Sequence, residues 1–120
     1  MDEALLTLLR SVDTPTVCNA IETAEGRRGF HAFTRGTVMA SAPDYRAMVG
    51  YARTARISAI APSPDPADVV RERRLGYYRH MSEGPRPAVA VVEDVDGADA
   101  IGAYWGEVNT NVHKSLGLDG

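Results

Sequence analysis

A glycine followed by an acidic residue opens a short helical pattern near the end of the chain. The segment Ala103–Gly120 reads AYWGEVNTNVHKSLGLDG, in which Gly106 and Glu107 precede a helix that closes at Gly117 and would hand over to a strand, but the chain stops there. The first N–H groups of a helix have no partner within it, so a small carboxylate can dock there. Gly106 would let such a ligand approach the backbone closely. The segment is therefore compatible with a small-anion site at a helix start.

The same two residues also have a purely structural interpretation. Gly106 can be an ordinary turn residue, and Glu107 can be a first-turn acid that stabilises the helix through its dipole. A Gly-Glu pair is common in proteins, so from spacing alone we place the structural interpretation first.

Histidine and cysteine show no spacing typical of a metal site. His31, His80 and His113 lie far apart, and we interpret each as a surface or hydrogen-bonded histidine, with His113 better placed for solvent or an interface than for a ligand. Cys18 is the single cysteine, which excludes an internal disulfide and suits a small buried side chain. The sequence contains no Ser-His-Asp set, phosphate-binding loop or paired-cysteine motif.

Two charged groups allow a functional and a structural interpretation. Glu93 and Asp94 follow a short apolar run, and ligands of α/β proteins often gather at such strand ends, although acids also flank strands as solvated loop residues. Arg71, Arg73 and Arg74 form a basic run, which is typical of a solvated helix face and, as a second choice, of an interface. We place the solvated interpretation first in both cases.

Composition and charge exclude several classes of protein. The 120 residues, of which 44% are hydrophobic and 24% charged, suffice for one compact globular domain. A net charge of −3 gives no general reason to expect nucleic-acid or membrane binding. No apolar run approaches the roughly 20 residues of a membrane helix. The N-terminus MDEALLTLLR carries acids where a signal peptide carries bases, so we expect a cytoplasmic protein without a targeting segment.

Two amphipathic helices are predicted at the N-terminus, with Asp2 and Glu3 in the first turn of the first one. Thr14 is the predicted N-cap of the second helix, Pro15 its first residue and Gly26 its end. The apolar face positions are Leu5, Leu8, Leu9 and Val12 in the first helix and Val17, Ala20, Ile21 and Ala24 in the second.

Strands are predicted at Gly36–Ser41, Met48–Ala59 and Pro87–Val92. In the second of them, Arg53 interrupts the apolar alternation. The third is an unbroken apolar run, which is typical of a strand covered on both faces.

Three further helices are predicted in the rest of the chain. Asp65 is the expected N-cap and Pro66 the first residue of a helix that runs to about Met81. The other two helices are expected at Ala98–Ala103 and Glu107–Leu116. This order of elements predicts an α/β fold, in which we expect the two N-terminal helices to pack on a sheet containing the third strand.

Three segments resemble motifs of the RraA-like family, which includes 4-hydroxy-4-methyl-2-oxoglutarate aldolases. Thr14–Glu22 (TPTVCNAIE) resembles the early helix TPT(V/L)-x-DA(L/M), with Asn19 where Asp is usual. Met48–Thr54 (MVGYART) resembles the strand G-x-A-x-T, and Gly106–Gly120 (GEVNTNVHKSLGLDG) resembles GE-x-x-A-x-x-A-x-x-x-G-x-x-G. The order and rough spacing agree, so residues 1–120 are similar to the N-terminal three-quarters of one RraA-like domain.

The resemblance implies a fold, a chemistry and an assembly. The fold is a swivelling-domain-like α/β/β/α layering, C-terminally shortened, in trimers or hexamers with sites between subunits. The aldolases bind the oxygens of pyruvate through Mg²⁺ or Mn²⁺ and stabilise an enolate. On this sequence, the resemblance makes Glu107 the catalytic acidic residue. Val108 and Asn109 supply the backbone amides for the pyruvate carboxylate, and Gly106 completes the substrate site.

The family also places an Arg-Asp pair roughly twenty residues beyond the acid, and 13 residues follow Glu107. We therefore expect the substrate-clamping Arg and the metal-binding Asp to be absent from this chain, with no metal ligand to assign. We expect little or no aldolase or oxaloacetate decarboxylase activity from the chain alone.

Three hypotheses follow from the resemblance. The chain is a shortened member of the lyase family, a non-catalytic binding protein that acts by surface contact as the family's ribonuclease E inhibitors do, or a structural partner whose missing groups come from another chain.

Overall fold

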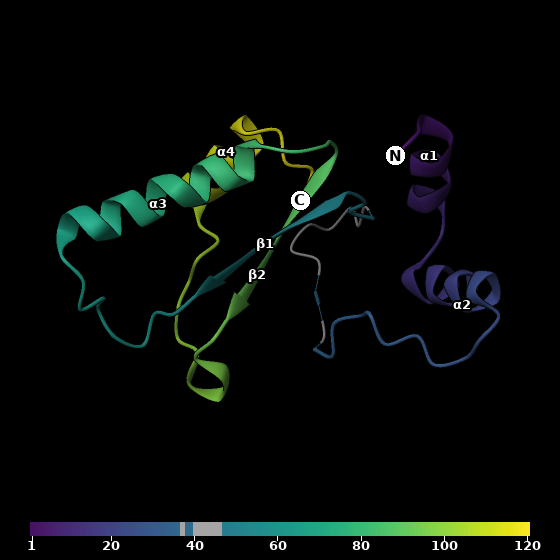
Figure 1. The fold of residues 1–120 in the computed structure, drawn as a ribbon, viewed down its shortest axis with the longest axis horizontal. Helices are drawn as coiled ribbons and strands as arrows, with labels where there is room; N and C mark the ends of the chain where they lie inside the picture. The colour runs from purple at the N-terminus through teal and green to yellow at the C-terminus, as the bar shows by residue number, and fades with distance from the viewer. Residues whose placement is uncertain (37, 40–46) are drawn as a thin grey trace. The chain divides into compact units, whose positions relative to one another are not determined.

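The computed structural model describes residues 1–36, 38–39 and 47–120. The chain forms two compact units, Met1–Met48 and Val49–Gly120, and each is described by itself. The second unit combines helices with a small parallel sheet, so the prediction of an α/β protein is confirmed (Figure 1). The swivelling-domain layering and the packing of the N-terminal helices on the sheet stay predictions.

The first unit contains α1 (Glu3–Ser11) and α2 (Thr14–Glu25). Asp2 caps α1 and accepts a 2.7 Å hydrogen bond from the N–H of Leu5, which satisfies one of the free donors of the first turn.

The start of α2 differs from the prediction. Asp13, not Thr14, is the N-cap, and its carboxylate accepts a 2.8 Å hydrogen bond from the N–H of Thr16. The predicted cap was wrong by one residue because an Asp directly before a Thr-Pro pair offers the stronger charged acceptor to the first turn. Gly26 ends α2 at φ 64° as predicted.

The second unit is built on a strand–helix–strand segment. β1 (Tyr51–Ile57) and β2 (Ala88–Asp94) pair in parallel, with Tyr51 opposite Ala88 and Ile57 opposite Asp94. α3 (Ala67–Ser82) connects them. The strands predicted at Met48–Ala59 and Pro87–Val92 are confirmed within a few residues. Half of the strand predicted at Gly36–Ser41 lies outside the described residues, and its described residues 36, 38 and 39 are not in a strand.

Gly50, the residue before β1, lies where the backbone leaves no room for a side chain. A Cβ at this position would lie 2.9 Å from the carbonyl oxygen of Pro87 and 3.0 Å from the backbone of Ala88. The backbone of the chain entering β1 therefore runs directly against the start of β2, where no side chain fits.

The chain continues the sheet after its last helix. Asp119 donates its N–H to the carbonyl oxygen of Ala88, and Ala90 donates to that of Gly120, both at 2.8 Å. Leu118 forms a parallel bridge with Ala88. We expected no strand after the last helix, and the structure has an isolated bridge there, so β2 lies between β1 and this segment.

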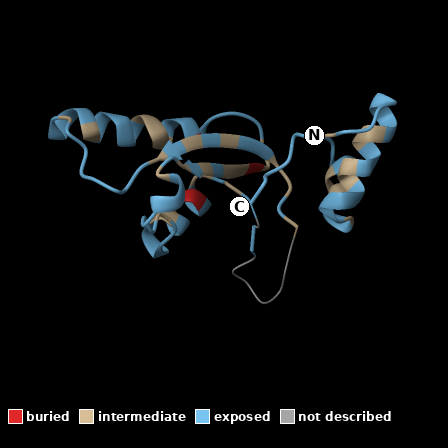
Figure 2. Cartoon of the chain, turned by 90° about the horizontal axis from the view of Figure 1, so that it is seen from below, coloured by how far each residue is buried: buried red, intermediate tan, exposed pale blue. Residues whose placement is uncertain are grey.

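Burial on β2 differs from the expected cover on both faces. Ala88 is buried, but the side chain of Val91 is 43% exposed. α3 packs on β1 rather than across the whole sheet, which leaves alternate residues of β2 accessible (Figure 2).

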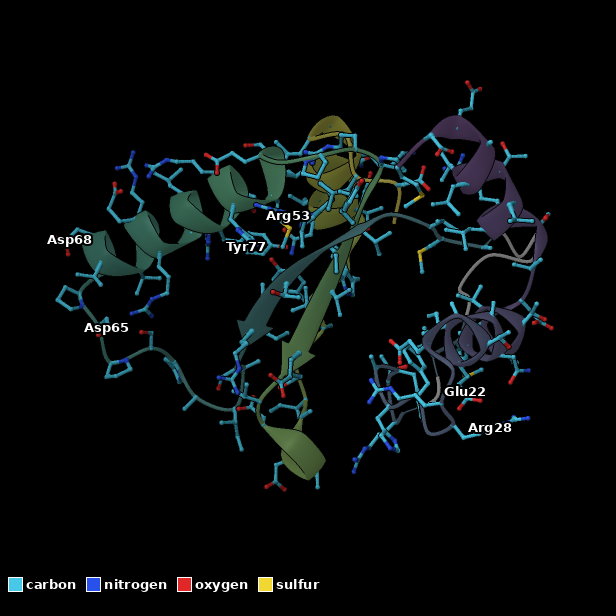
Figure 3. The ribbon with its side chains drawn as sticks, turned by 45° about the vertical axis from the view of Figure 1, so that its right-hand side comes forward. Glu22, Arg28, Arg53, Asp65, Asp68 and Tyr77 are labelled. Carbon is cyan, nitrogen blue, oxygen red and sulfur yellow. The ribbon has the colours of Figure 1, made fainter. Side chains whose placement is uncertain are left out.

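α3 begins one residue later than predicted. Pro66 occupies the N-cap position, and no side chain caps the helix. Asp65, the predicted cap, accepts hydrogen bonds from Ser63 and, at 2.7 Å, from Arg73, because these donors lie on its own loop and on the next turns of the helix. Figure 3 shows Asp65 on the loop that leads into α3.

The helix predicted at Ala98–Ala103 was wrong. The structure has a single 3₁₀ turn, η1 (Gly97–Asp99), and no regular helix follows it up to α4. Gly97 has φ 61°, and a Cβ on Gly102 would lie 2.6 Å from the Cβ of Ala59. The segment is therefore irregular because it packs closely against the loop after β1.

α4 (Glu107–Ser115) matches the predicted last helix closely. Gly117 follows it at φ 79° and donates its N–H to Lys114, while Leu118 donates to His113 at 3.1 Å. This paired pattern is the usual glycine-terminated helix end.

One arginine joins the ends of the two helices of the second unit. The Nη2 atom of Arg86 donates to the carbonyl oxygens of Met81, Ser82 and Leu116 at 2.9–3.0 Å. A cation is favourable at the carboxyl ends of α3 and α4, where free carbonyl groups gather. Arg86 therefore links the carboxyl end of α4 to that of α3.

Candidate functional site

A groove of about 1070 Å³ lies at the carboxyl end of β1. Its walls are the end of β1, the loop that follows it, one face of α3 and the start of α4. Ligand sites of parallel α/β proteins commonly lie at the carboxyl ends of strands. The groove is therefore the place in this unit where a ligand is most expected.

The four predicted site residues all line this groove. Gly106, Glu107, Val108 and Asn109 form the start of α4, and the first bond within the helix runs from Thr110 N–H to Gly106 O at 3.0 Å. The N–H groups of the three residues before Thr110 have no partner within the helix. No side chain caps this helix start. The structure thus brings the predicted residues together, and their role stays a prediction.

The backbone of Gly106 does not itself require glycine. Its φ is −114°, and a Cβ there would meet no heavy atom within 4 Å. A side chain at this position would therefore meet no neighbouring residue.

Asn109 fixes the position of this helix start. Its side-chain amide donates to the carbonyl oxygen of Tyr104 at 2.8 Å, and its Oδ1 accepts from the hydroxyl of Tyr78 at 3.4 Å. Because the side chain is engaged with the preceding loop and with α3, the backbone N–H is the group that Asn109 can offer to a ligand.

His113 is buried, contrary to the expectation of a solvent or interface position. It is 5% exposed, its Nδ1 lies 2.6 Å from the carbonyl oxygen of Asn109, and its Nε2 contacts the hydroxyl of Tyr77. A carbonyl only accepts, so Nδ1 donates to the carbonyl oxygen of Asn109. The expectation was wrong because four residues after Asn109 is the helix face turned toward α3.

Aromatic rings surround this histidine, and the sequence analysis did not single them out. Tyr77, labelled in Figure 3, belongs to α3, and its ring contacts Tyr104 and His113. Burial raises the pKa of Tyr77 and that of Tyr104 above the usual value for tyrosine, so both phenols stay protonated near neutral pH. The rings in contact with His113 are Tyr77, Tyr78, Tyr104 and Trp105.

The three arginines of the basic run on α3 differ in their surroundings. Arg73 and Arg74 line the groove, whereas Arg71 does not. Arg73 is paired with Asp65, and this hydrogen bond lowers the pKa of that carboxyl. Arg74 has no carboxylate partner among the described residues and lies near Tyr104. It is the cation of the groove that an anionic ligand can reach without breaking an ion pair.

The acids at the end of β2 have structural partners. Glu93 pairs with Arg56 at 2.9 Å, and Asp94 accepts from the N–H of Asp96 at 3.0 Å. These contacts support the solvated interpretation that we placed first.

Asp96 was missed by the sequence analysis. Its carboxylate accepts from the hydroxyl of Ser58 at 2.6 Å and from the N–H groups of Ala59 and Ile60 at 2.6 and 2.9 Å. The hydroxyl of Ser58, followed by the N–H of Ala59, lowers the pKa of Asp96. The carboxylate therefore fixes the loop that forms one wall of the groove. The sequence signal at this position, an Asp before a glycine, is typical of a turn and does not reveal these distant partners.

Among the residues that the structure describes, no three His, Cys, Asp or Glu side chains gather closely enough to hold a metal ion. These residues do not fit the Mg²⁺ or Mn²⁺ that the resemblance implies, and we derive no step through a metal. Across the same residues, no helix combines the length and apolar character needed to cross a bilayer.

Comparison with known proteins gives no relative of this chain: no family model matches it, and no curated protein or solved structure matches it significantly. The resemblance to the RraA-like family therefore stays a prediction that is supported by the three sequence segments alone.

Proposed function

We propose that the groove binds the carboxylate of a small 2-oxo acid such as pyruvate. The chain would then be an RraA-like protein of swivelling-domain type, related to metal-dependent 4-hydroxy-4-methyl-2-oxoglutarate aldolases and oxaloacetate decarboxylases. One observation carries the proposal. The uncapped start of α4 opens into a groove at the carboxyl end of β1, on which the unpaired Arg74 also borders.

The parts of the site have distinct roles in this proposal. The N–H groups of Val108 and Asn109 donate to the carboxylate, and Gly106, which has no side chain, lets the ligand approach the backbone closely. Arg74 adds a positive charge on the opposite element.

Glu107 has two opposing effects. Its carboxylate is favourable at the start of α4 but repels an anion bound to the same N–H groups. This repulsion weakens the binding of an anion to these N–H groups. The resemblance assigns Glu107 as the catalytic acidic residue, and we propose that it acts at the reacting end of the substrate. We propose that the chain alone has weak activity or none, because its described residues do not assemble a metal site.

The alternative is a non-catalytic regulatory protein that acts through protein contacts, as the family's ribonuclease E inhibitors do. Such a protein acts by surface contact and needs no catalytic set. This alternative predicts no turnover and no dependence of partner binding on the groove.

Titration calorimetry with pyruvate tests the proposal. Replacing Arg74 by Met should weaken pyruvate binding about two- to fivefold, the effect of one exposed charged contact of about 0.5–1 kcal/mol. Arg71→Met is the matched control, because Arg71 lies on the same helix outside the groove, and it should bind like the wild type. Equal affinity of both variants, or no pyruvate binding by the wild type, would overturn the proposal.

A further inference from the structure

The groove is larger than a three-carbon acid requires. Its volume of about 1070 Å³ lies just above the roughly 300–1,000 Å³ typical of sites for drug-sized ligands. A pyruvate held at the start of α4 would leave most of this space to water.

The face of α3 that borders the groove is suited to fill that space. Its groove residues are Val70, Arg73, Arg74, Tyr77 and Tyr78, whose spacing of three and four residues places them on one side of the helix. Val70 and the two tyrosines are half-buried, so they form an apolar and aromatic surface beside the two arginines.

The tyrosine rings that line the groove form an aromatic cluster. Tyr77 contacts Tyr78 edge to face, with centroids 5.5 Å apart at 64°, and contacts Tyr104 at 6.0 Å and 90°. Edge-to-face and offset contacts are the favoured geometries between aromatic rings. Pro62 and Pro64 on the facing loop add a further rigid apolar border.

We infer that the ligand of the groove is a 2-oxo acid that carries an aromatic ring. The ring lies against Val70 and Tyr78, while the carboxylate lies between Arg74 and the start of α4. This inference rests on the proposed function, because it assigns the substrate class of the same site.

Calorimetry with three small molecules separates the two proposals. The probes are pyruvate, benzoylformate, which is a 2-oxo acid with a phenyl ring, and the methyl ester of benzoylformate, which lacks the charge. Benzoylformate should bind at least about tenfold more tightly than pyruvate, the order expected for burying a phenyl ring. The ester should bind more weakly than benzoylformate.

Neighbouring valines of α3 provide a matched pair of variants. Val70→Asn places an amide in the apolar wall and should weaken benzoylformate binding several-fold while changing pyruvate binding less than twofold. Val69 lies outside the groove and is 43% exposed, so Val69→Asn should bind both acids like the wild type. Thermal unfolding of both variants checks that each is folded.

Each other outcome overturns a specific claim. If pyruvate binds and benzoylformate binds no more tightly, or if Val70→Asn and Val69→Asn bind benzoylformate equally, the inference about the ring is wrong while carboxylate binding stands. If neither acid binds, or if the ester binds as tightly as benzoylformate, the proposed carboxylate site itself is wrong, and the inference falls with it.

Discussion

Single polar side chains fix much of the second unit at the residue scale. Arg86 joins the ends of α3 and α4, and Asp96 gathers three donors from the loop after β1. Among the described residues only Met81, Ala88 and His113 are buried, so charged hydrogen bonds carry a large share of the local order (Figure 2).

Asp96 makes this order dependent on pH. Its pKa in the folded protein is lowered below the ordinary value of 3.8, so its ionised form contributes stability above that value and loses the contribution as pH falls below it. Asp96→Asn should lower the Tm at neutral pH, and the difference from the wild type should shrink between pH 4 and pH 2. Thermal unfolding followed by circular dichroism measures it. A difference that grows on acidification would show that the carboxylate does not stabilise this loop.

The sequence predicted helix ends correctly where the residue that sets them acts on its own neighbours. The end of α2 at Gly26 and the start of α4 at Glu107 were both correct, because glycine and first-turn acids act within one helical turn. The burial of His113 and the role of Asp96 were missed, because each depends on partners more than thirty residues away in the sequence.

At the scale of elements, close backbone approach determines where glycine is needed. β1 enters the sheet against the start of β2 at Gly50, whereas Gly76 lies within α3 with open space around it. The sequence predicted β1 from its alternation, β2 from an unbroken apolar run and α3 from the residues at its start. It could not predict the irregular segment after η1, because that segment follows from packing of Gly102 on Ala59.

Two alanine variants test this distinction. Gly50→Ala should destabilise the protein by about 1–3 kcal/mol, because the added Cβ forces β1 and β2 apart. Gly76→Ala should stabilise it by about 0.5–1 kcal/mol, because alanine favours a helix interior. Urea unfolding of both variants measures these changes. Similar effects of the two substitutions would contradict the close approach at Gly50.

At the scale of the whole molecule, the resemblance predicts an assembly. RraA-like proteins place their sites between subunits, and we therefore expect a homo-oligomer, most simply a trimer, in which groups from a neighbouring copy complete the groove. Sedimentation velocity at micromolar concentration should give the mass of three chains of 12.9 kDa. A clean monomer would count against the assembly and against sites shared between subunits.

The central claim is that the free N–H groups at the start of α4 hold a carboxylate. Gly106→Asp tests it most directly, because the new side chain can cap those N–H groups itself and repels an anion. We expect a slightly higher Tm, since Asp exceeds Gly as an N-cap by only a few tenths of a kcal/mol.

The deciding measurement is pyruvate binding by the wild type, Gly106→Asp and Gly106→Ala in parallel titrations. We expect Gly106→Asp to lose at least about tenfold in affinity, a free-energy cost of about 1.4 kcal/mol. Gly106→Ala, which adds a methyl group without a capping oxygen, should lose less. Wild-type affinity in the folded Gly106→Asp variant would contradict carboxylate binding at the start of α4.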